Sequence, residues 1–202
     1  EMSSGIITLV FNYVLLSLAG NIVVAAYGVV ANVSLVTLAV FNGIAQGSQP
    51  LISRNHGAER HSNVNSLKKL SLIVALVMGI ILYAVMYFAT DPIVAVFNSE
   101  HNAQLAKYAN TGVKLYFIGV LFAGLNIVGS SFFSAVEKAK EAAVISVLRG
   151  FVLVLLFVLI LPKALGVNGV WLSYPAGEFS TMLVMIVMFL LTNKKEKKQS
   201  LI

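Results

Sequence analysis

The stretch IVVAAYGVVANVSLVTLAVFNGI, from Ile22 to Ile44, contains no charged side chain. An α-helix needs about 20 largely apolar residues to cross the hydrocarbon core of a bilayer, so this stretch is long enough to span one. Similar stretches follow at 70–89, 112–136, 142–161 and 167–191, and a shorter one precedes it at 6–19. The sequence therefore predicts an all-α integral membrane protein.

With their flanking residues, these stretches predict six transmembrane helices in one lobe, 1–193, followed by a basic cytoplasmic tail, 194–202. The approximate helix bounds are 3–19, 22–47, 65–89, 103–136, 140–161 and 167–192. Because the first helix is short and the sequence starts with Glu1 rather than Met, we expect the chain to begin inside a helix of a longer protein.

The composition favours a membrane protein without enzymatic chemistry. Charged residues make up 11% of the chain, against roughly 25% in soluble domains. The absence of cysteine excludes disulfides and thiol chemistry. We find no phosphate-binding glycine loop, no nucleophile elbow and no paired acids at catalytic spacing. His56 and His61 lack a nearby Cys or Asp that would complete a metal site, so we expect no catalytic residue, cofactor or metal.

Basic residues follow the second, fourth and sixth predicted helices, and the other helix ends carry few of them. They are Arg54, Arg60, Lys68, Lys69, Lys138, Lys140, Lys194, Lys195, Lys197 and Lys198. The positive-inside rule then predicts a multi-pass protein of the cell inner (plasma) membrane with both ends of this segment in the cytoplasm. The net charge of +6 is a topology signal that also meets anionic membrane lipids, and we expect no nucleic-acid partner.

Four of the six predicted helices carry one face unlike lipid, at helical spacing. The first has Glu1, Gly5, Thr8 and Asn12; the second has Gly28, Asn32, Asn42, Gln46 and Gln49; the fourth has Gly112, Tyr116, Gly119, Asn126 and Ser130; the sixth has Trp171, Pro175, Glu178, Met182 and Met185. Such faces are explained equally well by helix packing, in which small residues permit close approach, and by a polar cavity.

Two charged side chains fall inside predicted helices. Glu178 lies about eleven residues into the sixth helix, near the middle of the bilayer by helix rise. A membrane-buried acid indicates function unless it belongs to a buried ion pair. Arg149 lies roughly two turns from the cytoplasmic end of the fifth helix, where we expect it to extend toward the headgroups.

A family resemblance rests on the polar segment GIAQGSQPLISRNHGAER, Gly43 to Arg60. It resembles the cytoplasmic signature that follows the second helix of each half in multidrug and toxic compound extrusion (MATE) transporters, where a Gln-Pro segment leads into an Asn-x-Gly-Ala turn and a basic loop. AAYGVVANV, 25–33, is similar to the start of that helix, and GVWLSYPAGE, 169–178, is similar to the last helix of the family. The likeness runs over nearly the whole chain.

The resemblance implies twelve helices in two six-helix lobes around a substrate cavity that opens alternately to each side. It implies that this chain is the C-terminal lobe of a member of the bacterial multidrug branch and that the N-terminal lobe is its partner. Glu1 falls where some members keep an acid. Asn126 lies near a position where some keep Asp, so a cation site of the kind found in those members would lack a titratable group here.

The implied activity is cation-coupled (H⁺ or Na⁺) antiport that exports organic cations and drugs. The coupling or substrate candidates are Glu178, Glu1 and Asn126, and the candidates for the cavity wall are Asn12, Asn32, Asn42, Gln46, Tyr116, Met182 and Met185. A Glu in an apolar cavity can exchange a proton for a cationic substrate. Two alternatives remain: a lipid-linked saccharide flippase of the same superfamily, whose cavity needs several bases, and a membrane module without transport.

The segment that carries the signature also predicts a local break in the second helix. Pro50 lacks an N–H and crowds the carbonyl of Gln46, so we expect the helix to bend or end there. Gly43 and Gly47 permit close packing against a neighbour, and Gly57 suits a turn with positive φ. The segment is either a rigid elbow or a hinge used in switching.

Overall fold

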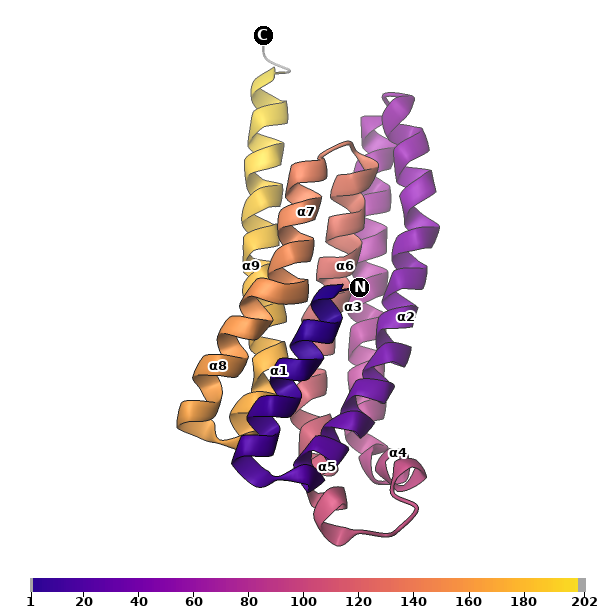
Figure 1. The fold of residues 1–202 in the computed structure, drawn as a ribbon. Coiled ribbons are helices and arrows are strands. Elements are labelled where there is room, and N and C mark those ends of the chain that lie inside the picture. The colour runs from indigo at the N-terminus through magenta and orange to yellow at the C-terminus, as the bar shows by residue number, and fades with distance from the viewer. Residues whose placement is uncertain (1, 200–202) are drawn as a thin grey trace.

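The computed structural model describes the backbone of residues 2–199 and the side chains of residues 5–192. Within this range all regular elements are helices (Figure 1). They are α1 (Met2–Ala19), α2 (Asn21–Gly57), α3 (His61–Phe88), α4 (Thr90–Phe97), α5 (Ala103–Tyr116), α6 (Val120–Ala135), α7 (Ala139–Val147), α8 (Leu153–Leu165) and α9 (Val167–Gln199). A 3₁₀ turn, Phe117–Gly119, joins α5 to α6, and a π-helical segment, Leu148–Val152, joins α7 to α8.

Five helical stretches are long and apolar enough to cross a membrane. They are Asn21–Gly57, His61–Phe88, Ala103–Ala135, Ala139–Leu165 and Val167–Thr192. Gly5–Ala19 is a sixth apolar helix that is shorter. The predicted all-α membrane fold with a short first helix is therefore confirmed.

The helix ends differ from the predicted bounds at the charged end of the molecule. α2 continues through Pro50 to Gly57, α3 already begins at His61, and α9 runs to Gln199, inside the stretch predicted as a tail. The sequence-based bounds followed the apolar stretches, whereas a helix satisfies its own backbone groups and can continue beyond them. The Lys and Glu residues of the last stretch are good helix formers.

The connections that carry basic residues lie together at one end of the molecule. The α2–α3 turn, the α6–α7 turn and the C-terminal end of α9 are at the top of Figure 1, opposite the α1–α2 turn, α4 and the α8–α9 turn. This arrangement agrees with six alternating crossings. That the basic end faces the cytoplasm of an inner membrane stays a prediction.

The short helix α4 lies at the opposite end and packs against α3 and α5. Asp91 and Pro92 both fall inside its first turn, and the residue before the helix, Ala89, makes no side-chain cap. The Asp91 Oδ1 accepts a hydrogen bond from Asn110 Nδ2 of α5 at 2.7 Å, which ties α4 to the lobe.

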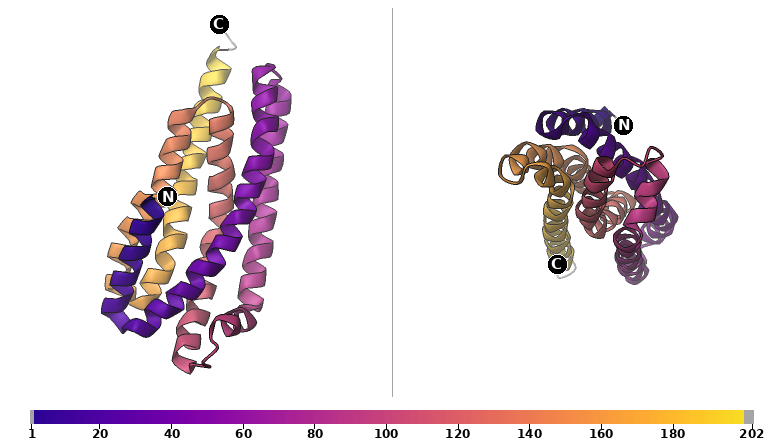
Figure 2. Two further views of the ribbon diagram at one scale, coloured as in Figure 1. Left: turned by 45° about the vertical axis from the view of Figure 1, so that its right-hand side comes forward. Right: turned by 90° about the horizontal axis from the view of Figure 1, so that it is seen from below.

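The core surrounds α6, which contacts α2, α3, α7 and α9. α8 and α9 form an antiparallel pair, and α1 packs against α2, α8 and α9 (Figure 2). Two positions show how closely α6 approaches its neighbours. A Cβ at Gly124 would overlap the ring of Phe41 on α2, and one at Gly79 of α3 would lie 3.3 Å from the carbonyl oxygen of Val120. Glycine is needed at both positions because a side chain would separate the helices.

Candidate functional site

The stripes predicted on the fourth and sixth helices face one another along α5, α6 and α9. Gly112 lies against Trp171, Gly119 against Tyr174, Asn126 against Glu178, and Gly129 against Met185. The glycines of the fourth predicted helix pack against the large side chains of the sixth. A Cβ at Gly119, for example, would stand 2.6 Å from the Tyr174 ring and 3.2 Å from Pro175 Cα. These two stripes are therefore a helix contact within the lobe.

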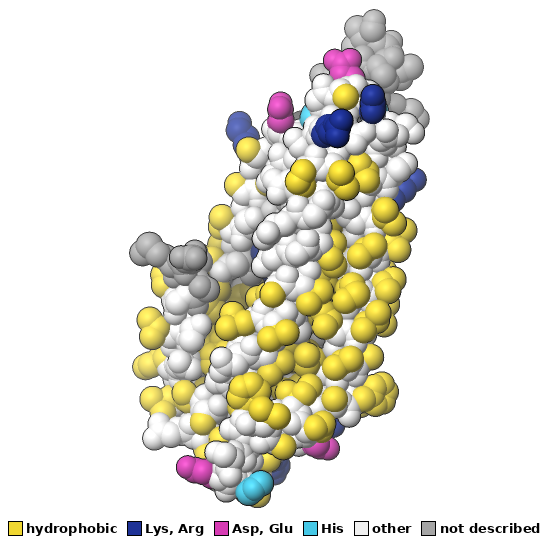
Figure 3. Space-filling model, turned by 90° about the vertical axis from the view of Figure 1, so that its right-hand side faces the viewer, with side chains coloured by type: hydrophobic (Ala, Val, Ile, Leu, Met, Phe, Trp, Pro, Cys, Tyr) yellow, Lys and Arg dark blue, Asp and Glu magenta, His cyan; other side chains and the backbone are white. Residues whose placement is uncertain are grey.

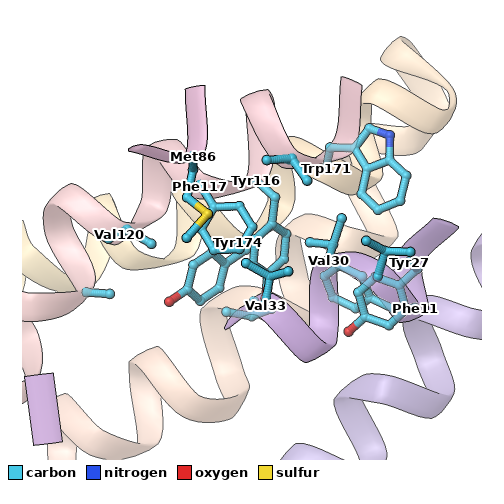
Figure 4. Close-up of a cluster of buried hydrophobic side chains, with 14 of the residues drawn as sticks. Phe11, Tyr27, Val30, Val33, Met86, Tyr116, Phe117, Val120, Trp171 and Tyr174 are labelled. Carbon is cyan, nitrogen blue, oxygen red and sulfur yellow. The ribbon is translucent and has the colours of Figure 1, made fainter. Parts of the chain in front are cut away.

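Aromatic rings extend this contact toward the start of α9. Tyr116 and Tyr174 stack with ring centroids 4.3 Å apart and planes 8° from parallel, and both are buried. Figure 4 shows these two rings between the helices, with Phe117 and Val120 nearby. Trp171 is fully buried, 6.3 Å from the ring of Tyr27.

The polar centre of the contact consists of Glu178, Asn126 and Arg149. Arg149 Nη2 donates to Glu178 Oε1 at 2.9 Å, and Arg149 Nε lies 3.2 Å from Oε1 and 3.4 Å from Oε2. Asn126 Nδ2 donates to Glu178 Oε2 at 2.7 Å and to the Glu178 backbone carbonyl at 2.8 Å. The carboxylate thus has a bidentate guanidinium partner on one side and an amide on the other. We call these three residues the Glu178 cluster.

Two local features bring the charges together. Gly177 lets the backbone of α9 approach α8 closely, because a Cβ there would lie 2.8 Å from Val154 Cγ2 and 3.2 Å from Val154 N. Arg149 sits in the π-helical segment Leu148–Val152, where the register of the helix changes. Isolated π-helical turns often occur at functional sites.

The Glu178 cluster changes the expectation for Arg149. The guanidinium does not extend to the headgroups but turns inward to Glu178, because a buried carboxylate offers a stronger partner than lipid headgroups two turns away. Tyr174, which was not singled out in the sequence, also lies beside the pair and interacts with both members. The sequence did offer a signal for this pairing, because Arg149 and Glu178 lie inside consecutive apolar helices.

The amide face of α2 behaves differently. Asn32, Asn42, Gln46 and Gln49 are all exposed on the lobe, and Asn32 bonds only to the Gly28 carbonyl of its own helix, at 2.8 Å. On α1, Asn12 is half-buried and Thr8 is exposed. Figure 3 shows the α2 side of the molecule, with hydrophobic side chains gathered over the right-hand flank and a hollow at half height on the left. These amides therefore do not pack inside the lobe.

Two other cavity-wall candidates pack inside the lobe. Tyr116 of α5 stacks on Tyr174 of α9, and Met185 of α9 is buried against Gly129 of α6. That they line a cavity of the complete transporter stays a prediction. Met182 is half-buried beside the same cluster. Glu1 lies outside the described residues.

The hinge or elbow candidates also differ from expectation. α2 does not end at Pro50. The positive φ of the turn occurs at Glu59 (55°) and not at Gly57. A Cβ at Gly43 or Gly47 would meet no atom within 4 Å, so neither glycine permits a close helix contact in this lobe. The exposed face of α2 explains this, since no helix of the described chain covers it.

The Glu178 side chain is only 1% exposed. A cavity of about 420 Å³ lies at the end opposite the basic turns, between the start of α2 and the α4–α5 connection. Within the described range, no three His, Cys, Asp or Glu side chains come together to hold a metal ion. The Glu178 cluster joins α6, α9 and the π-helical segment through one carboxylate.

Fold, apolar helices and a charge pair inside them define a multi-pass membrane transporter lobe. The sequence model of the MatE family matches residues 3–160, and the chain belongs to this family, whose members are transporters. No curated protein gives a match.

Solved structures give the same fold at low identity. The chain is similar to an outward-facing multidrug resistance MATE family transporter of the MOP superfamily, with a TM-score of 0.88 and 16% identity over 98% of this chain and 44% of that one. MATE in the bent conformation matches with a TM-score of 0.89 and 14% identity over 100% and 44%. A MOP superfamily transporter from Pyrococcus furiosus, in which reverse polarity of the binding pocket suggests a different function, matches with 0.86 and 13% over 95% and 43%. The chain thus spans less than half the length of each.

Proposed function

We propose that this chain is the C-terminal lobe of a cation-coupled (H⁺ or Na⁺) antiporter that exports organic cations and drugs by alternating access. The other wall of the substrate cavity comes from the N-terminal six-helix lobe of the same protein. The observation that carries the proposal is Glu178, a wholly buried carboxylate on a membrane-spanning helix. Because it is paired with Arg149, a structural ion pair is the competing explanation, and the efflux test below decides between the two. Acids at this depth are expensive in hydrocarbon and are retained where ions or protons are handled.

The exposed amide face of α2 supports the same proposal. Asn42, Gln46 and Gln49 lie on a helix long enough to cross the membrane, yet face neither the lobe interior nor a described partner. Amides facing lipid would leave donors and acceptors unsatisfied, so this face is expected to meet water or another protein surface. A substrate cavity between two lobes provides both.

The energetics are sufficient for export. Each elementary charge that crosses a potential of 100 mV contributes roughly 2.3 kcal/mol, enough for about a 50-fold substrate gradient. A carboxylate that binds either the coupling ion or the cationic substrate, but not both, couples the inward movement of the ion to the export of the substrate. No second binding site is needed. Glu178 is the residue assigned to this exchange.

The test is ethidium efflux from energised cells, for this chain alone and together with an N-terminal lobe, each with and without Glu178→Gln. We expect efflux only with both lobes, and its loss in the Gln variant at equal membrane abundance. Glu100→Gln, at an exposed acid in the α4–α5 connection, is the matched control and should keep wild-type efflux. Retained efflux with Glu178→Gln would refute the role of this acid.

The flippase alternative receives no support from the polar centre of the lobe. Its substrate carries a pyrophosphate and needs several free bases, whereas Arg149 is already paired with Glu178. If the chain is a membrane module without transport, Glu178→Gln should alter stability only and leave drug resistance unchanged. The efflux assay therefore separates this alternative from the antiporter.

A further inference from the structure

We propose that Arg149 is a tethered counter-ion that occupies Glu178 and must leave it before the coupling ion binds. Arg149 would then set the apparent affinity of the transporter for its coupling ion. This role rests on the proposed function of Glu178 but does not follow from it, because a lone carboxylate could couple without an internal competitor.

The guanidinium already fills the positions that a coupling cation would take. Arg149 Nη2 and Nε both lie within 3.2 Å of Oε1, and Nε lies 3.4 Å from Oε2. The remaining direction at Oε2 is taken by Asn126 Nδ2 at 2.7 Å. A proton or Na⁺ therefore replaces an existing partner of Glu178 rather than entering an empty site.

The pair is shielded unequally. The Glu178 side chain is 1% exposed, and that of Arg149 is 21% exposed. Arg149 is therefore the more exposed member of the pair.

The segment that carries Arg149 is less buried than the contact that holds Glu178. Leu148–Val152 is π-helical, and none of its residues is fully buried. A Cβ at Gly150 would have no atom within 4 Å. By contrast, Asn126 and Glu178 lie in the tightly packed contact between α6 and α9. Withdrawal of Arg149 therefore disturbs little packing, whereas movement of the other two residues would open the core.

The surroundings contain few other groups that could balance the charge. Tyr174 of α9 and Tyr116 of α5 are the titratable groups that face Glu178 besides Arg149. α6 carries no titratable side chain, α8 carries only Lys163 in its last turn, and Tyr13 of α1 is exposed. Neutralisation of Glu178 by a proton or Na⁺ would therefore leave Arg149 as the uncompensated charge, which favours its movement outward.

The first test measures the coupling-ion concentration for half-maximal drug transport by the complete transporter in proteoliposomes, at fixed membrane potential, with Na⁺ and with pH varied in turn. A site that is free in about one molecule in ten has an apparent affinity about tenfold below the intrinsic one. In Arg149→Gln we therefore expect the half-maximal ion concentration to fall about tenfold; for protons, the profile moves to higher pH. Arg149→Lys keeps the competing charge and should stay near wild type, as should Lys107→Gln at an exposed base.

The outcomes separate this inference from the function on which it rests. Efflux retained by Glu178→Gln refutes the proposed function. Efflux lost in Glu178→Gln, with an unchanged half-maximal concentration in Arg149→Gln, refutes the tethered counter-ion alone. A purely structural role for Arg149 predicts that result, with lower abundance and lower maximal rate.

The second test uses the unmodified transporter, so it does not depend on the folding of any variant. Phenylglyoxal reacts with accessible guanidinium groups, and the modified peptide containing Arg149 can be quantified by mass spectrometry. We expect the coupling ion to raise the rate of modification at Arg149 several-fold and to leave the rate at Arg54, an exposed residue of α2, unchanged. An equal rate at Arg149 with and without the coupling ion would overturn the inference.

Discussion

α6 and α2 both carry small and amide side chains along one face, but the face of α6 is buried and the face of α2 is exposed. The face of α6 is buried against α9, where Asn126 donates to Glu178 and Gly129 lies against Met185. The face of α2 is exposed, and Asn32 bonds only within its own helix. A stripe unlike lipid therefore indicates that something other than lipid covers it, and only the neighbouring helices decide whether that is the same lobe.

This difference separates residues that hold the lobe together from residues available to a substrate or a second lobe. Changes in the α6–α9 contact other than at Glu178 should act on stability first. Changes on the α2 face should act on transport with little effect on stability. Substitutions at four places in the lobe test this division.

The largest effect is expected at the ion pair. Arg149→Met leaves a buried carboxylate without its charged partner and should lower the free energy of unfolding by about 3–5 kcal/mol. The double variant Arg149→Met with Glu178→Leu replaces the pair with apolar side chains and should recover most of this loss. Denaturant unfolding in detergent measures both. A double variant as unstable as the single one would show that the ion pair is not the source of the effect.

The two asparagines provide a matched comparison. Asn126→Leu removes donors to the carbonyl and carboxylate of Glu178 and should destabilise the lobe by about 2–3 kcal/mol, because one acceptor is charged. Asn32→Leu should change stability by less than about 0.5 kcal/mol. In transport assays, however, Asn32→Leu should raise the KM for a cationic drug. Equal stability losses in the two variants would contradict the division between the faces.

Two glycines test the same contrast sterically. In Gly119→Ala the new Cβ would stand 2.6 Å from the Tyr174 ring, so we expect a loss of about 1–2 kcal/mol from strain. Gly47→Ala meets no atom within 4 Å and should be neutral or slightly stabilising in thermal unfolding. If Gly47→Ala instead abolishes transport at normal stability, that glycine lies against the second lobe.

The smallest effect is expected at Pro50, where the helix continues without interruption. Pro50→Ala should change the free energy of unfolding by less than about 0.5 kcal/mol, as at other exposed positions. For a rigid helix, drug turnover should stay within about twofold of wild type, which is about 0.4 kcal/mol on the barrier. A tenfold loss of turnover at normal stability would identify a hinge instead.

Much of the fold could be predicted from the sequence. The length of apolar stretches indicated six helices, and Lys and Arg placement put two connections and the C-terminal end of α9 at one end, because both depend on the local cost of placing a residue in lipid. The positions of the helix ends were harder to predict from the sequence. α2 passes Pro50 and α9 extends to Gln199, since a helix beyond the membrane no longer needs apolar residues.

The site could be predicted only in part. Glu178 and Asn126 were singled out because polar groups are costly at membrane depth, and the structure brings them together. The direction of Arg149 was wrong because a long side chain can reach either the headgroups or the interior, and sequence depth does not decide between them. The placement of Tyr116 and Met185 on a cavity wall stays a prediction, because helical spacing alone does not reveal which partner covers a face.

The sequence by itself determined the membrane-spanning helices, their alternation and the helical faces that avoid lipid, because each of these depends on the free energy of single residues in hydrocarbon. The tertiary structure alone decided which of these faces meet. It packed Gly112 and Gly119 against the rings of Trp171 and Tyr174 on α9, paired Arg149 with Glu178, and left the amides of α2 uncovered. Those outcomes depend on distances between helices, and these distances cannot be derived from the properties of single residues.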